Sequence, residues 1–217
     1  MKDIQEAFAY QFKDPNIVSK FIIGSLIALS SMFLIPMAFM VGYLVRNIRN
    51  IINKEKSPLP EWSDWGKMYV EGLKFILASL VYALPAVIVI ILGATIMMIG
   101  LLVFENEDAA IIFVIPYLLA QVFTMLYTLV LSLVTPVLYI KVAQGAKAKE
   151  LYNVKEIFKF VKLNFVNILI SFLVLMACGF VMNVGMLFLF IGIFPAMYYC
   201  STVTGYVYAQ IKLQEKK

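Results

Sequence analysis

The sequence predicts an all-α fold: a polytopic membrane bundle of about six spans, arranged as three hairpins that each follow an amphipathic helix at the membrane surface. Of the 217 residues, 63% are hydrophobic and 14% are charged, whereas soluble domains average ~45–50% apolar and ~25% charged residues. The apolar residues form long runs, and Lys and Arg gather in the short segments between these runs. We therefore expect one integral membrane domain over residues 1–217, with hairpins at about 17–53, 72–145 and 163–213.

Charge placement predicts how often the chain crosses the membrane. The apolar runs occupy about residues 21–45, 75–104, 109–140 and 165–211. Of the 18 basic residues, three precede residue 21, six lie at 46–74, six at 141–162 and three after 211. Because basic loops stay in the cytoplasm, an even number of crossings must separate these segments. Both termini are therefore expected on the cytoplasmic side of the cell membrane.

The first apolar run predicts a hairpin with a tight outer turn at Leu34-Ile35-Pro36. At 1.5 Å per residue, residues 17–35 and 36–53 would each supply about 27 Å of helix, enough to cross when flanking bases extend to the membrane surface. The alternative is a single span, which would place the N-terminus outside the cell.

The other two hairpins follow from run length. The runs at 75–104 and 109–140 supply two spans, joined by the acidic segment 105–108. The run at 165–211 has 47 residues, which would make a helix of ~70 Å, far longer than the ~30 Å hydrocarbon core. We expect it to break near Gly192-Ile193-Phe194-Pro195, because proline is accepted at the start of a helix and not in its interior.

Each hairpin follows a segment whose apolar residues recur every three or four positions, which is typical of a helix lying in the headgroup layer. These residues are Ile4, Ala7, Phe8 and Phe12, then Trp62, Trp65, Met68 and Tyr69, then Val154, Ile157, Phe158 and Val161. Pro60 is expected to begin the second helix. Asn153 is expected to cap the third, with Glu156 three residues further on.

Small residues at helical spacing predict where the spans pack closely. Gly24 and Ala28 mark such a face on the first span, and Ala86, Gly93 and Gly100, at intervals of seven, mark one on the third. The fifth span carries Asn164, Ser171, Cys178 and Gly185 at intervals of seven residues.

Four segments resemble a known family: Phe12-Lys13-Asp14-Pro15-Asn16, Gly42-Tyr43-Leu44-Val45-Arg46-Asn47-Ile48-Arg49, Pro58-Leu59-Pro60-Glu61-Trp62-Ser63-Asp64-Trp65-Gly66 and Gly192-Ile193-Phe194-Pro195. The chain is similar to the prokaryotic family of small multi-span membrane proteins catalogued as domain of unknown function 4013. The resemblance implies a helical membrane protein. It implies no reaction and no functional residue, because the family has no assigned activity.

A first candidate site is the cytoplasmic loop region between the first two hairpins. Its members are aromatic or charged: Arg46, Arg49, Glu61, Trp62, Asp64 and Trp65. On one interpretation, these residues dock a partner protein or a lipid headgroup. On the other, the tryptophans anchor the helix at the membrane interface and the carboxylates pair with nearby bases.

A second candidate is a polar stripe on the fourth span. Its members recur every three or four residues and so share one helix face: Tyr117, Gln121, Thr124, Thr128, Ser132, Thr135 and Tyr139. A polar stripe in lipid must face protein or water, which suggests a substrate path. The alternative is helix packing, in which the hydroxyls bond to their own helix or a neighbour at ~0.6 kcal/mol each.

Composition also limits the chemistry that we expect. The chain has no His, and Cys178 and Cys200 lie in apolar runs without metal-binding spacing, so we expect no enzyme, metal or cofactor. The expected function is a membrane-embedded binding or accessory protein. Its partners would be membrane lipids, an amphipathic peptide, another membrane protein or a further copy of the chain, and not nucleic acid. The alternative is an uncoupled transporter, pore or lipid translocator that uses the polar stripe.

Overall fold

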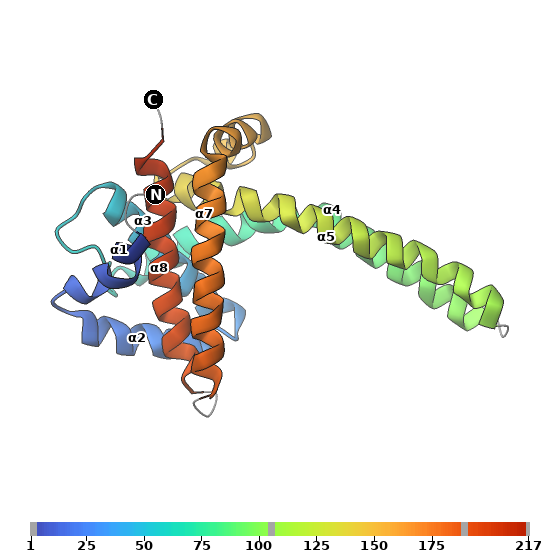
Figure 1. Cartoon of the computed structure of the whole chain (residues 1–217), viewed down its shortest axis with the longest axis horizontal. Helices are drawn as coiled ribbons and strands as arrows, with labels where there is room; N and C mark the ends of the chain where they lie inside the picture. Colours follow the sequence, from blue (N-terminus) through green and yellow to red (C-terminus); the bar gives the residue numbers. More distant parts are fainter. Residues whose placement is uncertain (1–3, 104–106, 188–190, 216–217) are drawn as a thin grey trace. The chain divides into compact units, whose positions relative to one another are not determined.

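The chain is all-α, as predicted. The computed structural model describes residues 4–103, 107–187 and 191–215, and this part of the chain contains eight α-helices and one short 3-10 helix (Figure 1). The helices are α1 (Ile4–Ala9), η1 (Tyr10–Lys13), α2 (Ile17–Ser30), α3 (Leu34–Ile52), α4 (Trp65–Val103), α5 (Glu107–Ala143), α6 (Ala148–Leu151), α7 (Val154–Leu187) and α8 (Ile193–Leu213).

Three stretches among the described residues are long and apolar enough to cross a membrane: Trp65–Val103, Ile112–Ala143 and Val154–Leu187. This length and composition fit a membrane protein. Helix α2 is apolar but has only 14 residues, about 21 Å of helix, which is shorter than the ~30 Å hydrocarbon core. Six crossings in three hairpins stay a prediction.

The first apolar run forms two helices, α2 and α3, but the break lies at residues 31–33 rather than at the predicted turn 34–36. Helix α2 ends early because the hydroxyls of Ser30 and Ser31 donate to the carbonyls of Ile27 and Ala28. Such bonds compete with the helical backbone pattern. Pro36 lies in the first turn of α3, where its missing N–H has no helical partner to lose.

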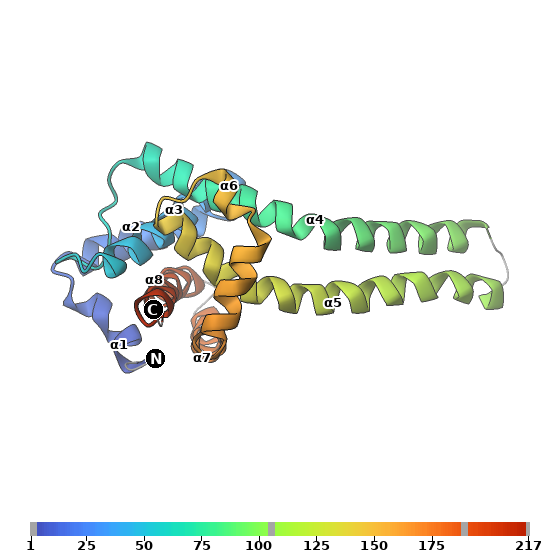
Figure 2. The ribbon, with the colours of Figure 1, turned by 90° about the horizontal axis from the view of Figure 1, so that it is seen from above.

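Residues 79–135 form one compact unit, an antiparallel hairpin made of the later part of α4 and the earlier part of α5, which lie side by side (Figure 2). Small residues bring the two helices close, as predicted for this face. A Cβ atom at Gly93 would lie 2.7 Å from the Cβ of Ala120, and one at Gly100 would overlap Phe113.

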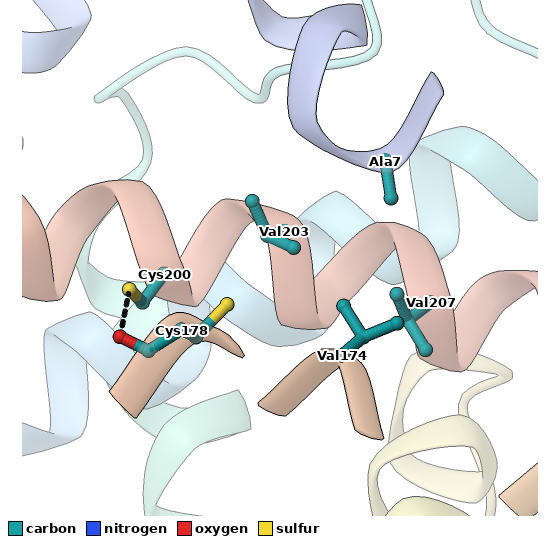
Figure 3. Close-up of a cluster of buried hydrophobic side chains, with 6 residues drawn as sticks. All are labelled: Ala7, Val174, Cys178, Cys200, Val203 and Val207. Carbon is teal, nitrogen blue, oxygen red and sulfur yellow. Dashed lines mark hydrogen bonds between the residues drawn. The ribbon is translucent and has the colours of Figure 1, made fainter. Parts of the chain in front are cut away.

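The second compact unit comprises residues 1–78 and 136–217. Its central element is α8, against which α1, α2, α3 and α7 pack. Figure 3 shows the contact of α7 with α8, where Val174 and Cys178 meet Cys200, Val203 and Val207, next to Ala7 of α1. Both cysteines are free and buried, and the Cys200 thiol donates to the carbonyl oxygen of Cys178 over 3.3 Å.

The break predicted at 192–195 falls close to the start of α8, which begins at Ile193 and carries Pro195 in its first turn. Helix α7 ends at Leu187, and residues 188–190 lie outside the described part of the chain. Residues 104–106, in the predicted acidic loop, also lie outside it. One helix ends and the next begins close to each predicted turn: α4 ends at Val103 and α5 begins at Glu107, and α7 ends at Leu187 and α8 begins at Ile193.

The third of these segments is helical and has the predicted cap. The Asn153 side-chain oxygen accepts from the Glu156 backbone N–H at 3.4 Å, and helix α7 begins at Val154. At Asn164 the backbone leaves helical geometry, with φ −111° and ψ 17°. The kink separates a surface segment, residues 154–163, from the apolar remainder of α7.

The predicted first residue of the second amphipathic helix is wrong. Pro60 does not begin a helix, since residues 60–64 are non-helical and α4 begins at Trp65. Asp64 adopts a positive φ of 52°, which interrupts a right-handed helix. Tertiary contacts hold this loop in place, as described below.

Candidate functional site

The loop that precedes α4 is fastened to the N-terminal part of the chain by a buried lysine. Lys20 on α2 is only 1% exposed. Its ammonium group lies 2.9 Å from the Asp14 carboxylate and 2.7 Å from the Glu61 carboxylate. It also donates to the Leu59 carbonyl at 2.9 Å and to the Ser57 hydroxyl at 3.2 Å. A buried charge needs such partners because it has lost its water.

Asp14 is ionised within this cluster. Burial alone would raise its pKa, but hydrogen bonds from Ser57, from Lys20 and from the Asn16 backbone N–H together lower the pKa below its usual value. The Ser57 hydroxyl donates to Asp14 at 2.6 Å, and the Asn16 N–H donates to it at 2.9 Å. Two of the segments that carry the family resemblance, 12–16 and 58–66, therefore meet at Lys20.

An aromatic cluster continues from the lysine. The Trp62 indole N–H donates to the Lys20 carbonyl at 3.1 Å, and the Trp62 ring stacks on Tyr43 with centroids 4.1 Å apart. Trp65 stacks in turn on Trp62 at 5.6 Å. The hydroxyls of Tyr43 and Tyr198 form a hydrogen bond of 2.8 Å. The two tryptophans thus lie against α3 and α8.

Two arginines hold the start of α4 against α3. Glu71 accepts from Arg46 at 3.0 Å and from Arg49 at 2.7 Å. Arg46 also donates to the carbonyls of Ser63 and Asp64, at 2.8 and 3.1 Å. The residues of the predicted docking loop are therefore brought together, with Glu71 as a partner that the sequence analysis missed.

Every residue of that loop prediction has a partner inside the chain. Glu61 pairs with Lys20, Asp64 pairs with Lys67 at 3.0 Å, and both arginines pair with Glu71. Trp65 is the more exposed of the two tryptophans, with 43% of its surface exposed. These contacts match the interpretation in which the carboxylates pair with nearby bases. Docking of a partner at this loop stays a prediction.

A second polar cluster, which sequence reasoning missed, lies buried between η1, α3 and α8. The Tyr10 hydroxyl donates to the Thr202 carbonyl at 2.8 Å, and the Asn47 amide donates to the Tyr10 hydroxyl at 2.8 Å. Thr202 also donates to the side-chain oxygen of Gln11. Burial raises the pKa of Tyr10 far above its usual value, so its hydroxyl stays neutral. The one signal in the sequence is that Asn47 lies in the segment 42–49, which carries the family resemblance.

The polar stripe lies on α5, and three of its hydroxyl groups bond to their own helix, whereas the buried Thr124 hydroxyl has no hydrogen-bond partner among the described residues. Thr128 donates to the Thr124 carbonyl at 2.7 Å, Ser132 to Leu129 at 2.7 Å and Thr135 to Leu131 at 2.9 Å. The Gln121 amide donates to the Tyr117 hydroxyl, one turn earlier, at 2.6 Å. Such self-contained bonds are those of the packing interpretation.

The last member, Tyr139, belongs to the other compact unit, where its ring stacks on Phe75 at 3.6 Å. The 79–135 hairpin carries a groove of about 400 Å³ whose wall includes Gly93, Ile96, Pro116 and Ala120. No stripe residue lines this groove. The role of the stripe as a path stays a prediction.

Comparison with known proteins finds one family. A family model described as "Protein of unknown function (DUF4013)" matches residues 25–191. This range covers all of α3, α4, α5, α6 and α7, together with the loop 58–66. No curated protein and no solved structure matches the chain.

Proposed function

The chain belongs to the DUF4013 family of proteins of unknown function, and we propose that it is an integral membrane protein without a catalytic site that binds membrane lipids. An amphipathic peptide or a membrane-protein partner is the other kind of ligand that such a protein would take. In the proposed topology, six spans form three hairpins, and both termini and both basic loops face the cytoplasm of a prokaryotic cell.

The observation that carries this proposal is the uncovered apolar surface of the long helices. Only 17%, 11% and 22% of the most apolar stretches of Trp65–Val103, Ile112–Ala143 and Val154–Leu187 are buried in protein. A soluble monomer rarely exposes apolar patches beyond a few hundred Å². Lipid tails are the simplest cover for side chains such as Leu84, Ile88 and Leu119, each at least 50% exposed.

The pattern of polar contacts favours binding over transport. The hydroxyls of Thr128, Ser132 and Thr135 bond to carbonyls of their own helix, so these three donors stay paired when the helix lies in lipid. A substrate path would instead need those groups free to exchange partners with water or substrate.

Thiol accessibility in lipid tests the choice between these functions. In a Cys178→Ala, Cys200→Ala background, the variants Thr124→Cys, Thr128→Cys and Ser132→Cys are reconstituted in vesicles and treated with a charged thiol reagent from either side. We expect no labelling at the three positions. Lys155→Cys, on the exposed surface segment of α7, is the labelled control.

Labelling of all three stripe positions at the rate of the control would overturn the binding proposal in favour of a path. The side from which Lys155→Cys reacts also tests the topology, since this position is expected on the cytoplasmic side. Mass spectrometry of the protein released from a mild detergent provides the direct readout. We expect bound phospholipid, and a chain that emerges without lipid would contradict the proposal.

A further inference from the structure

A charged pocket of about 430 Å³ lies where the end of α5, helix α6, the surface segment of α7 and the end of α8 meet. This volume is within the ~300–1,000 Å³ typical of small-ligand sites. Its charged lining consists of Lys141, Lys159, Lys212, Glu150, Glu156 and Glu215. The three bases and three acids give the lining no net formal charge, so it does not select a simple anion or cation by charge alone.

Two of the lysines in the charged pocket are already paired. Lys141 lies 2.9 Å from the Glu156 carboxylate, and Lys212 pairs with Glu215. Among the described residues, the Lys159 ammonium and the Glu150 carboxylate have no ion-pair partner. The charged pocket therefore offers one free positive group and one free negative group to a ligand.

One side of the charged pocket is apolar. Val137, Phe160 and Leu163 line it, and Leu163 is 64% exposed. Leu163 directly precedes the kink at Asn164, where the surface segment of α7 passes into its long apolar part. In the proposed topology this is the level at which lipid headgroups meet acyl chains. The position therefore suits a ligand with a charged head and an apolar tail.

We propose that the charged pocket binds the headgroup of a phospholipid that carries both a phosphate and a primary amine. Lys159 pairs with the phosphate, Glu150 accepts hydrogen bonds from the ammonium group, and the acyl chains leave past Leu163. This inference rests on the proposed function, because it requires the chain to be embedded in lipid. Beyond the proposed function, it names the class of lipid headgroup that is bound and the two residues, Lys159 and Glu150, that select it.

Competition between lipids tests the selectivity. The purified, delipidated chain is mixed with phosphatidylethanolamine, phosphatidylcholine and phosphatidylglycerol of identical acyl composition, and bound lipids are counted by native mass spectrometry. We expect about a two- to fivefold preference for phosphatidylethanolamine, the effect of one partly exposed ion pair. The choline group has no N–H to donate, and the glycerol headgroup carries no cation.

Variants assign that preference to the pocket. Glu150→Gln should remove the preference over phosphatidylglycerol, and Lys159→Gln should weaken binding of all three lipids. Lys155→Gln is the matched control, because it makes the same charge change on the same exposed segment outside the pocket lining. Unchanged thermal unfolding of the variants shows that they remain folded.

The outcomes separate this inference from the proposed function. Bound lipid without headgroup preference, or equal losses in Lys155→Gln and Lys159→Gln, overturns the pocket assignment alone. The absence of any bound lipid contradicts the proposed function as well. Soluble phosphoethanolamine is a further arm: displacement of the lipid by it at millimolar concentration would show that the headgroup alone is the ligand, whereas no displacement indicates that the acyl chains are needed.

Discussion

The hydroxyl groups of Tyr43 and Tyr198, 155 positions apart in the chain, share a buried hydrogen bond of 2.8 Å. Both side chains are fully buried. The pair joins α3 to α8 and supports the Trp62 ring that stacks on Tyr43. It thus connects the centre of the larger unit to the loop before α4.

This pair predicts a measurable coupling. Tyr43→Phe and Tyr198→Phe each leave one buried hydroxyl without its partner and should each cost about 1–3 kcal/mol of unfolding free energy. The double variant should cost less than the sum of the two, since no unpaired hydroxyl remains. Denaturant unfolding in detergent gives the three values, and strict additivity would show that the hydroxyls do not interact.

Lys20 predicts a large and asymmetric effect. Lys20→Met removes the ammonium group and leaves the Asp14 carboxylate buried without its charge partner, which should cost about 3–5 kcal/mol. Adding Asp14→Asn should recover part of this loss. Glu61→Gln is the control, because the Glu61 side chain is 58% exposed and its pair should contribute under about 1 kcal/mol. Equal losses for Lys20→Met and Glu61→Gln would contradict the assignment of Asp14 as the main partner.

The same carboxylate predicts a pH dependence. The pKa of Asp14 is lowered in the folded chain, where hydrogen bonds outweigh the opposing effect of burial. Its contribution to stability is therefore fully present above the unfolded pKa of ~3.9 and is lost as the pH falls through the lower folded value. Melting temperatures between pH 6 and 3 should show the wild type approaching Asp14→Asn below about pH 4. A constant difference between the two curves would exclude this titration.

Gly24 predicts a steric effect. A Cβ atom at Gly24 would overlap the ring of Tyr198, and the ring is held by its hydrogen bond to Tyr43. Gly24→Ala should therefore destabilise the fold by about 1–3 kcal/mol. Gly179→Ala is the matched control, because a Cβ there has no neighbour within 4 Å. Thermal unfolding of both variants decides the matter, and an unaffected Gly24→Ala would show that α2 can move away from α8.

Loss of a polar group should cost less in the stripe than in the buried cluster of Tyr10, Asn47 and Thr202. Thr128→Val removes a hydroxyl that bonds only within its own helix and should cost well under ~1 kcal/mol. Asn47→Leu breaks the fully buried cluster with Tyr10 and Thr202 and should cost about 2–4 kcal/mol, since the remaining groups lose their partner. Unfolding free energies measured in one detergent compare the two. A larger loss for Thr128→Val would mean that the stripe, and not the buried cluster, holds the fold together.

Several features of this protein could be predicted from the sequence because they depend on composition or on neighbours a few residues apart. The all-α class follows from the length of the apolar runs. The Asn153 cap involves Glu156 only three residues further on, and the small residues Gly93 and Gly100 mark a face that packs against the next helix. The family resemblance is likewise carried by short local segments.

The tertiary structure decided the features that depend on distant residues. Pro60 satisfies the local rule for starting a helix, yet α4 begins at Trp65, because Lys20 and Arg46 bind the preceding loop through its carbonyl groups. The partners of Lys20 lie up to 41 positions away, and no periodic pattern in the chain identifies them. A buried polar group is stabilised by whichever partner the packed helices bring within hydrogen-bond distance. The hydrogen-bond partner of such a group is therefore determined only when the helices pack together.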